Sequence, residues 1–166
     1  MTTAITNEQL FVKTALASWN TTAGRAFKIF DSLSDEQLLK EIAPGKNRGL
    51  YLLGHLIAVN DAMIPQLRLG EASYTYLWES FVKQRDRAVS DLPPTAELRQ
   101  NWKDSLAQLS EMLSNLSPSD WLERHATVSE EDFINEPHRN RLAILLSRTG
   151  HLSYHIGQLV LIDKSL

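Results

Sequence analysis

The sequence predicts an all-α protein, a four-helix bundle with short extra helices in the connections between its long ones. Three observations support this prediction. Apolar residues recur at helical spacing in four long segments, no segment combines strand-like alternation with a hairpin turn, and the six prolines fall mostly where helices should begin or end. A length of 166 residues with 43% hydrophobic content fits one domain, residues 1–166, which is large enough to bury a core without disulfides.

The first long helix is expected from Asn7 to about Leu33. Its apolar side chains recur mostly at steps of three and four residues and therefore form one face: Leu10, Phe11, Ala15, Trp19, Ala23, Phe27 and Phe30. Ser34, followed three residues later by Gln37, is typical of a capping box at the start of a short second helix. The Pro44-Gly45 pair should end that piece.

A second long helix is expected over residues 50–69, with Gly70 placed to end it. Pro65 lies inside this segment and removes one backbone hydrogen bond. We therefore expect it to kink the helix or to end it a turn early. Residues 74–92 are ambiguous, because a short helix there would not segregate its apolar and polar side chains cleanly.

Thr95 is expected to cap a third long helix that extends to about Leu116. A polar connection follows over residues 118–135. Pro137 then stands where a first-turn proline would, at the opening of a last helix that runs to about Ile162. Apolar residues surround most of the circumference of this last helix, which predicts a central place in the bundle.

Charge and composition exclude several classes of function. The formal net charge is -3, so no cationic surplus exists to neutralise a nucleic-acid backbone. Cysteine is absent, and any metal must therefore be held by His, Asp or Glu. The amino terminus lacks the pattern of a secretory signal, and no apolar run approaches the roughly 20 residues that span a bilayer. We expect a cytoplasmic protein that acts on a small molecule, with no nucleic-acid or membrane partner.

Three of the five histidines are candidate metal ligands. His151 and His155 are four residues apart, which places them one turn apart on a single helix face. His55 lies on an apolar stripe of the second long helix. Metal sites in bundles are built from side chains on facing helices, and three imidazoles with an open fourth position are typical of catalytic zinc. Packing, with each ring hydrogen-bonded and inert, is the alternative interpretation.

The remaining candidates have weaker support. Tyr154 and Gln158 follow His151 and His155 by one turn on the same face, so they are candidates for contacts to the ligands or to a substrate, although plain packing is an alternative. His125 and His138 lie in a polar stretch and are interpreted as solvated surface residues. Asp61 follows His55 by six residues, which turns it away from that histidine, and we interpret it as a surface charge.

Common enzyme templates do not occur in the sequence. It has no G-x-S-x-G, no glycine-rich phosphate loop and no H-E-x-x-H with a built-in general base. A catalytic site would therefore have to take its nucleophile from metal-bound water or from a bound thiol. The sequence identifies no catalytic residue and no residue that binds an organic cofactor.

Two strings carry a resemblance to a known family. LLGHLIAVND on the second helix and HLSYHIGQL near the carboxyl terminus, with His151, His155, Gly157 and Gln158 as the most specific part, resemble the DinB-like superfamily of small bacterial metalloproteins. The resemblance implies a four-helix bundle in which three histidines hold a divalent ion, usually zinc or nickel, with water completing the shell. It carries the ligand role to His55, His151 and His155, and it implies a homodimer.

The resemblance leaves two functional interpretations open. The family includes S-transferases that use bacillithiol, glutathione or mycothiol, a maleylpyruvate isomerase branch, and members without an established activity. The first interpretation is a metal-dependent transferase, or hydrolase, in which the ion activates a low-molecular-weight thiol or water. The second is a non-catalytic stress-response protein whose metal ties two helices together. A catalytic site needs an open coordination position, whereas a structural one is closed.

Overall fold

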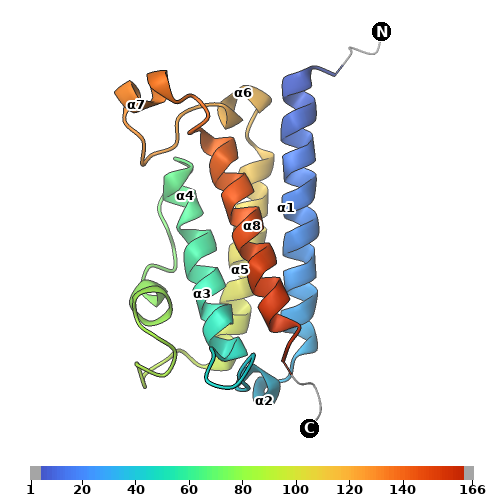
Figure 1. Ribbon diagram of the computed structural model, residues 1–166, viewed down its shortest axis with the longest axis vertical. Coiled ribbons are helices and arrows are strands. Elements are labelled where there is room, and N and C mark those ends of the chain that lie inside the picture. The colour runs from blue at the N-terminus through green and yellow to red at the C-terminus, as the bar shows by residue number, and fades with distance from the viewer. Residues whose placement is uncertain (1–4, 163–166) are drawn as a thin grey trace.

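Four long helices lie side by side along the length of the molecule (Figure 1). The computed structural model describes residues 5–162, and within that part all helices are α-helices except one short π-helix, with no β-strand. The long helices are α1 (Asn7–Ser32), α3 (Gly49–Asp61), α5 (Thr95–Ser114) and α8 (Arg141–Leu159). The predicted four-helix bundle is confirmed. No helix among the described residues is long and apolar enough to cross a membrane.

Short helices occupy the connections, as the sequence predicted. They are α2 (Asp35–Leu38), α4 (Met63–Gln66), the π-helix η1 (Glu79–Lys83), α6 (Pro118–Trp121) and α7 (Glu130–Asn135). The capping box at Ser34 is present: its hydroxyl accepts from the backbone N–H of Gln37, and the Gln37 side chain accepts from the Ser34 N–H. The second long helix is interrupted at Ala62, and α4 ends one residue after Pro65. The early end expected from this proline is therefore confirmed.

Two helix starts differ from the prediction. Thr95 is the first residue of α5 rather than its cap, and Pro94 occupies the capping position without a side-chain hydrogen bond. Likewise α8 does not open at Pro137. It begins at Arg141, because the side chain of Asn140 accepts a hydrogen bond from the Ala143 N–H and caps the helix there.

The most enclosed long helix is α3 and not α8. Every residue of α3 is buried except Tyr51 and His55. By contrast, α8 leaves Leu146 and Tyr154 more than half exposed, at 53% and 63%. The expected central place of α8 is therefore wrong, since its many apolar residues include several on an outward face. Tyr51 and His55 lie one turn apart and therefore mark the side of α3 that presents polar side chains.

Asp61 is not a surface charge. It is 3% exposed at the end of α3, where its carboxylate accepts hydrogen bonds from the backbone N–H groups of Ser73, at 2.9 Å, and Tyr74, at 2.7 Å. These bonds tie the segment after α4 to the end of α3. The Asp61 side chain takes no part in the histidine cluster described below.

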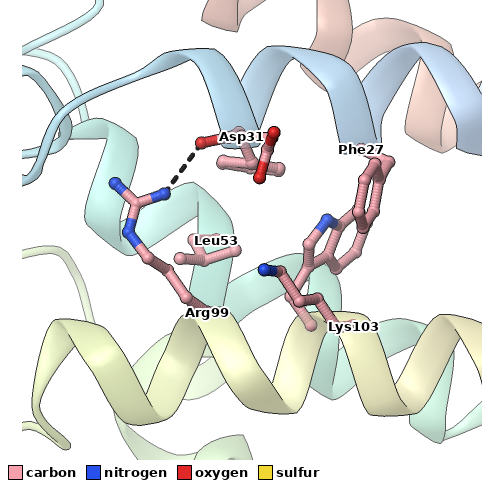
Figure 2. A pocket seen from close by; sticks show the side chains of 7 residues that line it. Phe27, Asp31, Leu53, Arg99 and Lys103 are labelled. Carbon is pink, nitrogen blue, oxygen red and sulfur yellow. Dashed lines mark hydrogen bonds between the residues drawn. The ribbon is translucent and has the colours of Figure 1, made fainter.

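One arginine joins the end of α1 to α5 (Figure 2). Arg99 extends from α5 toward α1 and donates to the backbone carbonyls of Phe30, at 2.8 Å, and Leu33, at 2.6 Å. It also donates to the carboxylate of Asp35 at 2.9 Å. The last carbonyls of a helix have no partner within the helix, and a cation there also interacts favourably with the helix dipole. Arg99 thus caps α1 and orients the turn into α2.

We predict that Arg99→Met lowers the free energy of unfolding by about 2 kcal/mol, because partly buried carbonyls lose a charged hydrogen-bond donor. Urea unfolding followed by circular dichroism measures the change. Arg25→Met is the control, since Arg25 is an exposed cation of α1, and its replacement should change stability by less than about 0.5 kcal/mol. Equal effects of the two substitutions would contradict the capping role.

Candidate metal centre

Three histidines from two helices meet inside the bundle. His55 comes from α3, and His151 and His155 come from α8, which lies against α3. The Nε2 atom of His151 is 3.3 Å from Nε2 of His55 and 3.1 Å from Nε2 of His155. The structure therefore brings together the three residues that the sequence identified as metal ligands, through the same nitrogen of each ring.

These separations fit a tetrahedral ion. Imidazole nitrogens bind zinc at roughly 2.0 to 2.1 Å, and two such ligands at the tetrahedral angle are about 3.3 Å apart. The observed separations of 3.1 and 3.3 Å match that value. No other His, Asp or Glu among residues 5–162 joins the three in the group that could hold an ion. Residues 5–162 thus offer three ligands, and a tetrahedral ion held by them would have a fourth position for another molecule.

Hydrogen bonds on the far side of two rings direct the metal-facing nitrogen. The Nδ1 atom of His55 lies 2.8 Å from the backbone carbonyl oxygen of Phe81. A carbonyl only accepts, so this Nδ1 carries the hydrogen and Nε2 keeps its lone pair. Nδ1 of His155 likewise lies 2.7 Å from Oε1 of Gln158, whose amide donates to the hydroxyl of Tyr154 at 3.0 Å. Such outer contacts are typical of metal-binding histidines.

The alternative of inert, satisfied histidines does not fit this arrangement. With the hydrogen on Nδ1 of His55 and His155, two Nε2 lone pairs face Nε2 of His151, which can carry at most one hydrogen. The buried Nδ1 atom of His151 has no hydrogen-bond partner among the described residues. A cation at the meeting point would bind all three lone pairs. The donor set and its geometry therefore fit a divalent metal ion.

Burial keeps the imidazoles neutral. It is the largest cause that lowers the pKa of all three rings, because a charged ring loses hydration inside the bundle. The pKa of His151 falls to about 4, with further contributions from His155, His55 and Arg148. Only a neutral imidazole offers a lone pair to a metal. The cluster is thus in its binding form at neutral pH.

The segment around η1 supplies a ligand contact that sequence reasoning missed. A Cβ at Gly54 would lie 2.4 Å from the Phe81 ring, so only glycine lets this segment approach α3. That approach brings the Phe81 carbonyl to His55. The ring of Tyr51 stacks near His55, with centroids 6.2 Å apart and planes at 12°. A contact from a backbone carbonyl cannot be recognised from the type of side chain. Gly54, inside a helical pattern, was nevertheless an indication that another segment packs closely against the helix there.

The other two histidines lie outside the cluster. His138 is exposed, as expected. His125 is only 7% exposed, and its Nδ1 lies 3.0 Å from the hydroxyl of Thr127. The interpretation of His125 as a solvated surface residue is therefore wrong: the backbone N–H of the next residue, Ala126, donates to the Gln66 carbonyl, and this bond holds the turn against α4. Neither ring takes part in the metal-ligand group.

Comparison with known proteins agrees with the architecture and the site. No curated protein matches the chain at a significant level. A family model described as the DinB superfamily matches residues 18–159, a stretch that includes all three clustered histidines. Because this match covers most of the 166 residues, the protein belongs to the DinB superfamily.

Proposed function

We propose that the protein is a metal-dependent enzyme of the S-transferase type, in which His55, His151 and His155 hold one divalent ion, zinc or nickel. The small molecule activated there is a low-molecular-weight thiol such as bacillithiol or glutathione, or failing that a water molecule. The observation that carries the proposal is the meeting of three Nε2 atoms with no fourth protein ligand among the described residues.

Exposure of the rings supports an open coordination position. His55 and His151 are partly exposed, whereas His155 is 8% exposed. Structural zinc sites are normally closed by four protein ligands, while catalytic sites keep three and admit a further molecule. The described residues provide three ligands and no fourth, and two of the three histidines are partly exposed, which favours the catalytic interpretation.

The residues of the chain have separable tasks in this proposal. When bound, the divalent ion lowers the pKa of a thiol or water and provides a nucleophile at neutral pH. The Phe81 carbonyl and the Gln158 amide hold their histidines in the ligand tautomer. Burial lowers the pKa of all three rings and so favours their neutral form. Since no carboxylate among residues 5–162 joins the cluster, the described residues offer no general base there.

A non-catalytic role for the ion is the second candidate. The cluster joins α3 to α8 through residues 96 positions apart in the sequence, so an ion there would also hold the bundle together. This interpretation predicts that metal raises stability but supports no turnover. The two candidates agree on metal binding and differ only in activity.

We predict that His155→Ala abolishes stoichiometric binding of zinc or nickel, because only two ligands remain. Elemental analysis and titration of metal into untagged protein measure the content. His138→Ala is the matched control, since it removes an exposed histidine outside the cluster and should leave one ion per chain. Unchanged metal content in His155→Ala would refute the site.

We predict that Gln158→Ala weakens metal affinity by about tenfold, because His155 loses the acceptor that orients its ring. Competition with a chromophoric chelator measures the dissociation constant. Tyr154→Phe is the control: it removes the hydroxyl that binds the Gln158 amide and leaves the contact between Gln158 and His155 in place. Its effect should be smaller. An affinity unchanged in Gln158→Ala would show that the hydrogen bond does not tune the ligand.

We predict metal-dependent thiol transfer to a generic electrophile, monochlorobimane. In that reaction the thiol sulfur forms a bond to carbon, chloride leaves, and the thiol proton passes to solvent. Rates should exceed the uncatalysed background with zinc or nickel for at least one of bacillithiol, glutathione and mycothiol, and return to background in His155→Ala. Absence of turnover with every thiol, in protein that binds one ion per chain, would favour the structural role.

A further inference from the structure

One arginine of α8 is withdrawn from solvent without an anionic partner. Arg148 is partly buried, and its guanidinium forms no hydrogen bond or ion pair with any residue in the described part of the chain. Burial lowers the pKa of this arginine, which reports the loss of hydration of its charge. Removing a cation from water without pairing it is costly, so such a side chain needs an explanation.

The other arginines of the described chain do not share this situation. Six of them form ion pairs with carboxylates: Arg48, Arg87, Arg99, Arg124, Arg139 and Arg141. Three more are exposed to water: Arg25, Arg68 and Arg85. Within residues 5–162, Arg148 alone is both partly buried and unpaired.

The position of Arg148 connects it with the three-histidine centre. It precedes His151 by three residues and His155 by seven, so the three side chains share one stripe of α8. Its charge acts on His151 of the same helix and on His55 of α3 across the bundle. Among residues 5–162, no other basic side chain outside the cluster acts on either of these two rings. The guanidinium therefore lies beside the centre.

We propose that Arg148 binds the carboxylate of the small molecule that reaches the three-histidine centre. The inference rests on the proposed function, and it names a property of the substrate or thiol: a carboxylate within a few atoms of the group that meets the metal. Three residues correspond to about 4.5 Å along a helix axis, so a molecule only a few bonds long can contact both Arg148 and the centre.

The chemistry of the Arg148 guanidinium favours a carboxylate over a phosphate. A guanidinium presents a planar fork that matches the two oxygens of a carboxylate. One positive charge balances one carboxylate, whereas a phosphate dianion is usually held by more than one cation or by backbone donors. The described residues place a single cation beside the centre.

Three thiols of similar length test the inference on cobalt-substituted protein. They are 3-mercaptopropionate, 2-mercaptoethanesulfonate and 2-mercaptoethanol, and the thiolate-to-cobalt absorption band reports the dissociation constant of each. We expect the carboxylate to bind about tenfold more tightly than the alcohol in the wild-type protein. In Arg148→Gln the two affinities should become equal, with that of 2-mercaptoethanol unchanged. Arg25→Gln, at an exposed arginine, should keep the difference.

One further measurement separates the possible failures. Acetate titration of 15N-labelled protein, followed at the Arg148 Nε–H signal, detects anion binding without any thiol. If no thiol alters the cobalt spectrum but acetate shifts this signal, the proposed thiol chemistry fails and the carboxylate site stands. If 2-mercaptoethanol binds as well as the carboxylate and acetate leaves the signal unmoved, the inference is overturned and the proposed function stands. A sulfonate that binds more tightly than the carboxylate would also overturn it.

Urea unfolding of Arg148→Gln tests whether Arg148 has a purely structural role. Because Arg148 has no partner among the described residues, Arg148→Gln should leave the urea midpoint unchanged or raise it. Arg148→Lys keeps the charge without the planar fork and should retain only part of the preference for the carboxylate. Marked destabilisation of Arg148→Gln together with a retained carboxylate preference would contradict the inference.

Discussion

The site depends on the contact between α3 and α8. His55 and His151 are 96 residues apart in the sequence, and their Nε2 atoms meet only because these two helices lie against each other. Leu52, Leu53 and Leu56 of α3 are fully buried, and this fixes the rotation of the helix, so that the less-buried His55 and Tyr51 share one side. A rotation of α3 by one residue, about 100°, would turn His55 away from α8. Packing of the core thus sets the geometry of the ligands.

A second layer of contacts holds the segment that supplies the Phe81 carbonyl. Gly54 lets the Phe81 ring pack directly on α3. Farther along the same segment, Asp86 accepts from the Arg48 backbone N–H at 2.8 Å and pairs with its guanidinium at 2.6 Å. Burial alone would raise the pKa of Asp86, but the hydrogen bonds and charge of Arg48 outweigh it and lower that pKa. The ion pair therefore anchors the segment to the start of α3 at ordinary pH.

Side-chain pattern predicted well which three histidines meet, but it predicted helix boundaries and backbone contacts poorly. Helical periodicity predicted which helix faces meet. It placed His151 and His155 on one face of the last helix, and it placed His55 on an apolar stripe of the second long helix. The contact between the Phe81 carbonyl and His55 could not be predicted from the sequence, because every residue has a backbone carbonyl. Asp61 and His125 were misplaced for a related reason. Asp61 is bound by the segment after α4 through the bonds from Ser73 and Tyr74, and His125 lies in a turn that is held against α4. Periodicity within a helix holds no information on such contacts.

The charge of Arg148 links the anion site to the metal site. A cation beside the imidazoles disfavours their protonation, which helps to keep the ligands free, but it also repels a divalent ion. A carboxylate bound to Arg148 would cancel that repulsion, and by linkage a bound ion would favour the carboxylate by the same factor. Metal and substrate would then strengthen each other's binding. Under this proposal, an unpaired arginine at this position would belong to a site that is complete only when both are present.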